Sequence, residues 1–189
     1  MKNYAMKLFV VFTLNVTLFT FHDVYDVFAA PRSTSAAQFL KIGLGARPMA
    51  MGGAFCGLAD DANAVVWNPA GLLQLESEEL TAMHNIWLEG MSMEYLAYAQ
   101  GLGNKGALGV SFIYLTSGDI KKYDKTGLEK GSYKAYDLSG SLSYSRKVTS
   151  QIFAGLNIKV IKEGIEDANA TGFGADIGFL YRMSRLRAG

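Results

Sequence analysis

The sequence has little of what most enzymes and disulfide-linked exported domains depend on. Its 189 residues include one cysteine, three prolines and two histidines, and only 19% are charged. A single cysteine, Cys56, excludes an internal disulfide and a zinc site built from cysteine pairs. Its neighbours are small or apolar, so we expect a buried filler and not a reactive thiol. The formal net charge of +1 lacks the basic excess that a nucleic-acid partner requires.

Catalytic and cofactor motifs are also missing. Beyond the first thirty residues only His84 remains, which is too few for a histidine metal cluster or a catalytic triad. The stretch Gly43-Leu44-Gly45 begins like a dinucleotide loop, but Pro48 replaces the third glycine. Asp60-Asp61-Ala62-Asn63 offers oxygen ligands for calcium, yet the glycine and distal glutamate of an EF-hand loop are absent. We expect no enzyme activity, no cofactor and no metal.

The N-terminus predicts an exported chain. Two lysines precede an apolar run over residues 8–21, and Ala29 and Ala30 follow it. This order is typical of a signal peptide, and the run is shorter than the roughly 20 residues of a membrane-spanning helix. We expect a signal peptide over residues 1–29, cleaved after Ala29. Cleavage after Ala37 and retention as a membrane anchor are the alternatives.

Residues 78–182 predict antiparallel β-strands, because apolar and small polar residues alternate in short segments separated by turn residues. In the clearest segment Tyr136, Leu138, Leu142 and Tyr144 share one phase, and serines occupy the other. No apolar run of eighteen residues remains here, so a membrane crossing would have to be a closed barrel. Six strands are predicted, over residues 79–88, 93–101, 106–116, 134–147, 151–163 and 170–182.

The strand pattern leaves alternatives open. The 79–88 and 93–101 segments alternate less cleanly, with His84 out of phase in the first. A soluble sheet with one buried face also gives period-two patterning, but glycine and serine on the polar face favour a barrel lumen. Six strands are fewer than the eight of the smallest bacterial barrels. We therefore expect an incomplete barrel ending in a truncated tail, residues 183–189; the alternative is a short barrel with further strands within residues 31–77.

Residues 30–77 are rich in glycine, alanine and methionine and predict short helices preceding the strands. Asp60 and Asp61 are placed to cap a helix over residues 62–66. Asn68 followed by Pro69 is a good N-cap and first-turn pair for a second helix over residues 70–75.

Four motifs in this region carry a resemblance to a known family: Gly45-Ala46-Arg47-Pro48, Met51-Gly52-Gly53-Ala54-Phe55, Ala59-Asp60-Asp61-Ala62 and Trp67-Asn68-Pro69-Ala70-Gly71. As a set they resemble the N-terminal motif of the PorV/PorQ and UPF0164 outer-membrane proteins, which are similar to the FadL transporters. The resemblance implies an all-β, antiparallel transmembrane barrel of about fourteen strands in the bacterial outer membrane. Residues 38–75 would form a plug inside it, and roughly the second half of the strands is missing here.

Three functions follow as hypotheses. The first is passive transport of hydrophobic compounds through a plugged barrel, in which Asn68 and Pro69 fix the plug turn. Arg47 and Asp60 are then candidates for an ion pair between plug and wall. The second, suggested by PorV, is an outer-membrane anchor or shuttle whose partners are secretion-system proteins. The third is a soluble periplasmic β-domain. Outer-membrane lipid is the expected partner of the first two.

Overall fold

A computed structural model describes residues 36–183 and 186–189. The predicted signal peptide lies outside these residues. Among the helices of the described part, none has the length and apolar character needed to cross a membrane.

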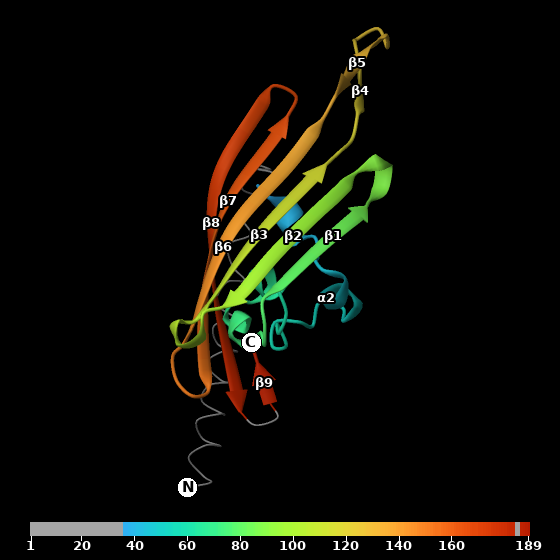
Figure 1. The fold of residues 1–189 in the computed structure, drawn as a ribbon. Helices are drawn as coiled ribbons and strands as arrows, with labels where there is room; N and C mark the ends of the chain where they lie inside the picture. The colour runs from blue at the N-terminus through green and yellow to red at the C-terminus, as the bar shows by residue number, and fades with distance from the viewer. Residues whose placement is uncertain (1–35, 184–185) are drawn as a thin grey trace, which may run out of the picture. The chain divides into compact units, whose positions relative to one another are not determined.

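The described chain is mostly antiparallel β-sheet (Figure 1). One seven-stranded sheet has the order β1-β2-β3-β6-β7-β8-β9 and curls into a half-barrel, and β4 and β5 form a separate two-stranded sheet. The strands are β1 (Glu79–Ile86), β2 (Ser92–Gly101), β3 (Ala107–Thr116), β4 (Ile120–Tyr123), β5 (Glu129–Tyr133), β6 (Ala135–Lys147), β7 (Ile152–Ile165), β8 (Ala168–Met183) and β9 (Leu186–Ala188).

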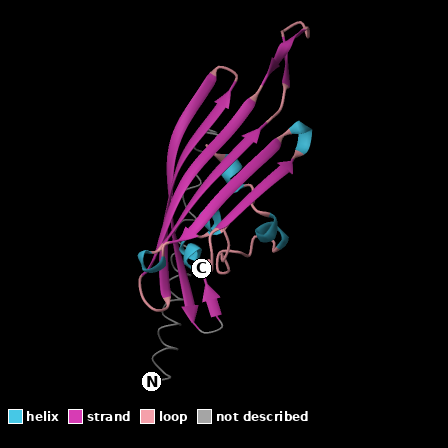
Figure 2. Ribbon diagram, viewed as in Figure 1, coloured by secondary structure: helices cyan, strands magenta, loops and turns pink. Residues whose placement is uncertain are grey.

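Short helices occupy the chain before β1 (Figure 2). They are η1 (Gln38–Lys41), α2 (Ala46–Ala50), α3 (Ala64–Trp67) and η2 (Pro69–Gln74), and the single turns η3 (Leu88–Gly90) and η4 (Gly103–Lys105) lie in the β1–β2 and β2–β3 connections. We call residues 37–77 the N-terminal segment. An antiparallel fold with a short helical segment before the strands is confirmed, and the described part of residues 31–77 adds no strand to the sheet.

All six predicted strands are present, with ends shifted by at most two residues. Two elements were not predicted. The charged loop after β3 contains the β4–β5 hairpin, whose turn is closed by Asp124: its Oδ1 accepts hydrogen bonds from the backbone N–H groups of Thr126 and Leu128. The stretch predicted as a tail contains β9, which pairs with the last residues of β8.

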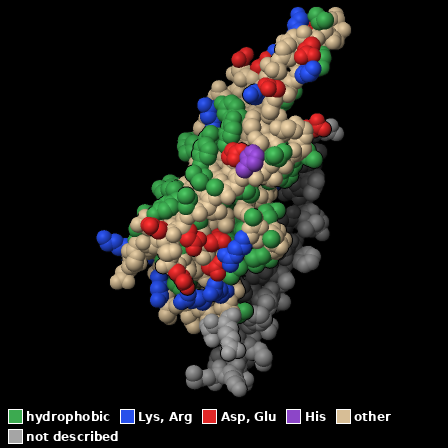
Figure 3. All heavy atoms as spheres, turned by 45° about the vertical axis from the view of Figure 1, so that its right-hand side comes forward, with side chains coloured by type: hydrophobic (Ala, Val, Ile, Leu, Met, Phe, Trp, Pro, Cys, Tyr) green, Lys and Arg blue, Asp and Glu red, His purple; other side chains and the backbone are tan. Residues whose placement is uncertain are grey.

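The two faces of the sheet differ in the way that the alternation predicts. On β3, Leu108, Val110 and Phe112 are exposed on the outer face, while Gly109 and Ser111 are buried on the inner face. Figure 3 shows hydrophobic side chains gathered over the sheet, with charged side chains mostly toward its ends. The outer face is therefore the apolar one.

The irregular alternation of the first strands also has a structural cause. On β2 the inner residues Met93, Tyr95, Ala97 and Ala99 are buried, because the N-terminal segment covers them. The inner face of β2 is therefore apolar too, so apolar residues are not confined to one phase of this strand. His84 lies on the outer face opposite Glu94, its register partner, with Nδ1 and Oε1 2.6 Å apart.

Candidate functional site

The N-terminal segment lies on the inner face of the sheet through two hydrophobic clusters. Phe55, Val65 and Leu72 pack with Ala99 and Ala107 of the sheet. In the other cluster Phe39 and Leu44 pack with inner residues of β2 and β3, including Ile113. The segment therefore covers the part of the inner face that is apolar.

The turn at Asn68 and Pro69 joins the N-terminal segment to the inner face of the sheet, which we call the wall. The Asn68 Oδ1 accepts a hydrogen bond from the Ala70 backbone N–H at 3.2 Å, and Pro69 is the first residue of η2, as predicted. The Asn68 Nδ2 donates to the carbonyl oxygens of Cys56 and Phe179, at 2.9 and 3.0 Å. Asn68 thus caps a helix and binds strand β8 with one buried side chain.

Glycines of the wall make room for this turn. Gly155 on β7 and Gly178 on β8 are register partners. A Cβ on Gly178 would collide with the Asn68 side chain and the Pro69 ring, and one on Gly155 would collide with the backbone of Pro69 and Ala70. Only glycine permits such close approach of another backbone. This pair of glycines is a signal that the sequence analysis missed.

Replacing Asn68 by alanine is expected to destabilise the folded chain by about 3 kcal/mol. The helix cap accounts for about 1 kcal/mol, and each carbonyl left without its donor adds about 1 kcal/mol. Asn68→Asp keeps the cap acceptor, but it sets a buried carboxylate against the carbonyl oxygens of Cys56 and Phe179, so it should destabilise the chain at least as much as alanine does. Urea unfolding in detergent measures both. Equal stability of wild type and Asn68→Ala would contradict this role.

Arg47 closes the N-terminal segment upon itself. Its Nη1 lies 2.7 Å from both Asp60 Oδ1 and Asp61 Oδ2, and its guanidinium lies 5.3 Å from the centre of the Phe55 ring. The hydrogen bonds to Asp60 and then to Asp61 raise the pKa of Arg47 above its ordinary value. The predicted plug-to-wall pairing of Arg47 is wrong, because both of its acidic partners belong to the segment. Asp60 does reach the wall, where its Oδ2 lies 3.6 Å from Arg187 of β9.

The capping prediction holds for Asp61 and is wrong for Asp60. Helix α3 begins at Ala64, and its N-cap residue Asn63 makes no side-chain cap. Asp61 Oδ1 accepts hydrogen bonds from the backbone and side-chain nitrogens of Asn63, and the backbone bond caps the turn that leads into α3. Asp60 makes no such bond and faces Arg47. Among the described residues, no group of three or more His, Cys, Asp and Glu side chains is arranged to hold a metal ion. The cation that contacts both carboxylates is the Arg47 guanidinium.

Replacing Arg47 by methionine is expected to loosen the N-terminal segment modestly, by about 1 kcal/mol or less, since the guanidinium is half exposed and its ion pairs are screened by salt. The rate of limited proteolysis within residues 37–77 should rise, and the difference from wild type should shrink in high salt. The exposed Lys125 on the hairpin provides the control, and Lys125→Met should leave the rate unchanged. A difference independent of salt would point to packing on Phe55 instead.

A polar ladder crosses the inner face beside the segment. Ser143 donates to Asn157 Oδ1 at 3.0 Å, Asn157 donates to Asp176 Oδ2 at 3.0 Å, and Lys159 Nζ lies 2.6 Å from the same Asp176 oxygen. Two residues before Ser143 on β6, the hydroxyl of Ser141 lies 2.7 Å from the hydroxyl of Ser111 on β3. The inner face is thus hydrogen-bonded across β3, β6, β7 and β8.

A cavity of about 500 Å³ lies where the segment meets β7 and β8. Its walls combine apolar side chains with the one ion pair of the ladder, and its lining includes Leu40, Trp67, Asn68, Lys159, Asp176 and Phe179. Cys56 also lines it and is exposed, so the prediction of a buried filler is wrong. Of the predicted site residues, Asn68 and Pro69 lie at this cavity, whereas Arg47 and Asp60 form the ion pair described above.

Comparison with known proteins gives one match. The model of a family described as Uncharacterised protein family (UPF0164) matches residues 29–178. No curated protein and no solved structure matches the chain. The motif resemblance to UPF0164 is thus confirmed over most of the chain.

Proposed function

Because the chain belongs to the uncharacterised family UPF0164, we propose a function from the physical character of its sheet. The protein is an outer-membrane β-barrel protein whose lumen is plugged by the N-terminal segment. It provides a passive route for hydrophobic compounds and carries out no chemical reaction. Its surroundings are the lipids of the bacterial outer membrane.

The observation that supports this proposal is the inverted polarity of the sheet. On β8 the outer residues Phe173, Ile177 and Phe179 are 83%, 72% and 62% exposed. On the inner face Ser143 and Asn157 are buried and hydrogen-bonded. Water would favour the opposite arrangement, with apolar side chains buried and polar ones exposed. Lipid around the outer face and a polar lumen account for both.

The height of the apolar surface also suits a bilayer. Along β8 the outer apolar residues run from Phe173 to Tyr181, eight residue steps at about 3.4 Å each, or about 27 Å of strand. At a tilt of about 40° this spans about 21 Å, close to the apolar band of about 25 Å on outer-membrane barrels. Tyr181, at one end of the band, suits an interfacial position.

Closure of the barrel is part of the proposal. Within the described residues β1 pairs only with β2, and β8 pairs on its second side only through Tyr181, Arg182 and Met183. Unpaired backbone groups are too costly in lipid for these edges to stay open. Further strands must therefore complete the ring in the membrane.

Fractionation and heat-modifiability test the membrane part of the proposal. The protein with its ring of strands complete should be recovered in the outer membrane and run faster on a detergent gel before boiling than after. Recovery in the soluble periplasmic fraction would support the soluble alternative instead. For transport, liposomes containing the purified protein should take up a fluorescent hydrophobic compound faster than empty liposomes. Unchanged uptake would reject the transport role while leaving the barrel intact.

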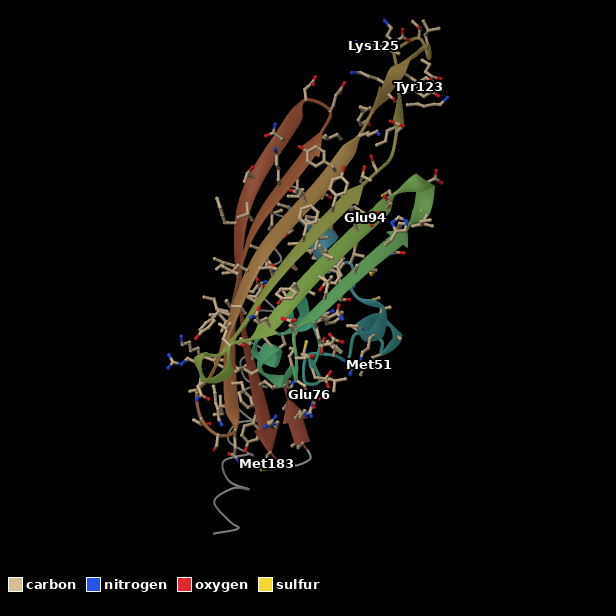
Figure 4. All side chains as sticks on the ribbon, in the orientation of Figure 1. Met51, Glu76, Glu94, Tyr123, Lys125 and Met183 are labelled. Carbon is tan, nitrogen blue, oxygen red and sulfur yellow. The ribbon has the colours of Figure 1, made fainter. Side chains whose placement is uncertain are left out.

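One observation favours the anchor or shuttle function as a second candidate. Figure 4 places Tyr123 and Lys125 on the β4–β5 hairpin, at the opposite end of the sheet from Met183. Tyr123 and Leu128 are exposed on this hairpin, and exposed apolar side chains among charges suit a protein contact. A detergent pull-down should recover secretion-system proteins, and recovery of this chain alone would reject the idea.

A further inference from the structure

The first residue of the N-terminal segment is hydrogen-bonded to a carboxylate on the inner face of the sheet. The N-terminal segment begins at Ala37, whose backbone nitrogen donates a hydrogen bond of 2.7 Å to Glu163 Oε1 on β7. The two residues are 126 positions apart in sequence. This contact therefore fixes where the chain enters the inner face.

Glu163 has an acidic neighbour and, among the described residues, no basic ion-pair partner. Asp137 of β6 is its register partner, and both side chains belong to the inner phase of their strands. Neither carboxylate forms an ion pair with a Lys, Arg or His side chain in residues 36–183 and 186–189. Like charges directly opposite each other across two strands destabilise a sheet. A cation seated at Glu163 would remove that repulsion.

The backbone conformation of Ala37 also favours a chain that begins at this residue. Its φ of 59° and ψ of 37° are left-handed, which is unfavourable for a residue with a Cβ. The φ torsion exists only because a carbonyl group of residue 36 precedes the nitrogen, and it is that group whose contacts restrict φ. In a chain that began at Ala37 the restriction would vanish and the nitrogen would be a charged amine.

The residues before the Ala36–Ala37 peptide bond have the small side chains that suit a signal-peptidase site. Thr34 and Ala36 are small residues at the third and first positions before the bond, as in the A-x-A pattern of cleavage sites. We propose that a signal-peptidase-type protease hydrolyses the Ala36–Ala37 peptide bond, and that the new α-ammonium of Ala37 binds Glu163 beside Asp137. Water adds across the bond, leaving a carboxylate on Ala36 and an amine on Ala37. The amine is mostly protonated at neutral pH, since α-amino groups have pKa values near 8.

N-terminal sequencing and intact mass measurement test the cleavage. The full chain with its own leader is expressed in a Gram-negative host and recovered from whatever envelope fraction holds it. The mature protein should begin at Ala37-Gln38-Phe39. A start at Ala30 or Gln38, or an uncleaved chain, would overturn the proposal. The variant Ala36→Leu should prevent this cut, and a product of unchanged start would also overturn it.

A second comparison tests whether the Ala37 α-ammonium binds Glu163. Glu163→Gln is made in the natural chain and in a variant with two serines inserted between Ala37 and Gln38, which moves the amine away while keeping Phe39 in place. The Tm should fall by at least about 3 °C more in the natural chain, because a charge-assisted hydrogen bond is lost only there. Equal falls would show that the amine is not bound at Glu163. Neither result depends on transport activity.

Discussion

Gly178→Val is expected to prevent the N-terminal segment from seating, with a loss of about 3 kcal/mol or more in the free energy of unfolding. The added side chain would meet Asn68 and Pro69, which are buried and held by hydrogen bonds from both sides. Overpacking of an interior by a few methyl groups alone costs about 1–3 kcal/mol, and here the Asn68 bonds to the wall would break as well. Urea unfolding and protease resistance of residues 37–77 measure the loss.

Gly172 provides a matched control on the same strand and the same inner phase. A Cβ on Gly172 would have nothing within 4 Å. Gly172→Val should therefore leave stability near wild type, since valine also favours strand conformation. If both valine variants lose stability equally, the cause is the loss of any glycine from β8 and not a clash with Asn68 and Pro69.

Ile158→Arg is expected to reduce the amount of folded protein in the outer membrane sharply. Ile158 lies on the outer face of β7, 52% exposed, between Leu142 and Ala175 on the neighbouring strands. An arginine near the bilayer midplane costs about 2–4 kcal/mol on the lipid face of a barrel. The heat-modifiable fraction on a detergent gel measures the effect.

The same change at an exposed position of the hairpin separates lipid from water. Leu128 is 64% exposed on the β4–β5 side of the protein, and Leu128→Arg should leave the folded fraction unchanged. In a water-soluble sheet Ile158→Arg would be nearly neutral as well, within about 0.5 kcal/mol, as surface substitutions usually are. A harmless Ile158→Arg would therefore reject the membrane proposal.

The strands of the sheet could be predicted well because alternation is a local property. Serines on one side of β6 and apolar residues on the other are visible in the sequence alone, and both faces have the exposure that this pattern predicts. The β4–β5 hairpin escaped prediction because its strands are short and charged, so they show no apolar phase. Its stability comes from the Asp124 turn and from ion pairs such as Lys121–Glu129.

The sequence by itself determined the strand positions, the Asn68-Pro69 helix start and the membership in UPF0164, because each rests on residues close together in the chain. Only the tertiary structure decided what those residues contact. Arg47 binds within its own segment, and Gly178 lies under a turn more than a hundred residues earlier. Such contacts depend on the register and curl of the sheet, which bring distant positions together and leave no spacing in the sequence by which to recognise them.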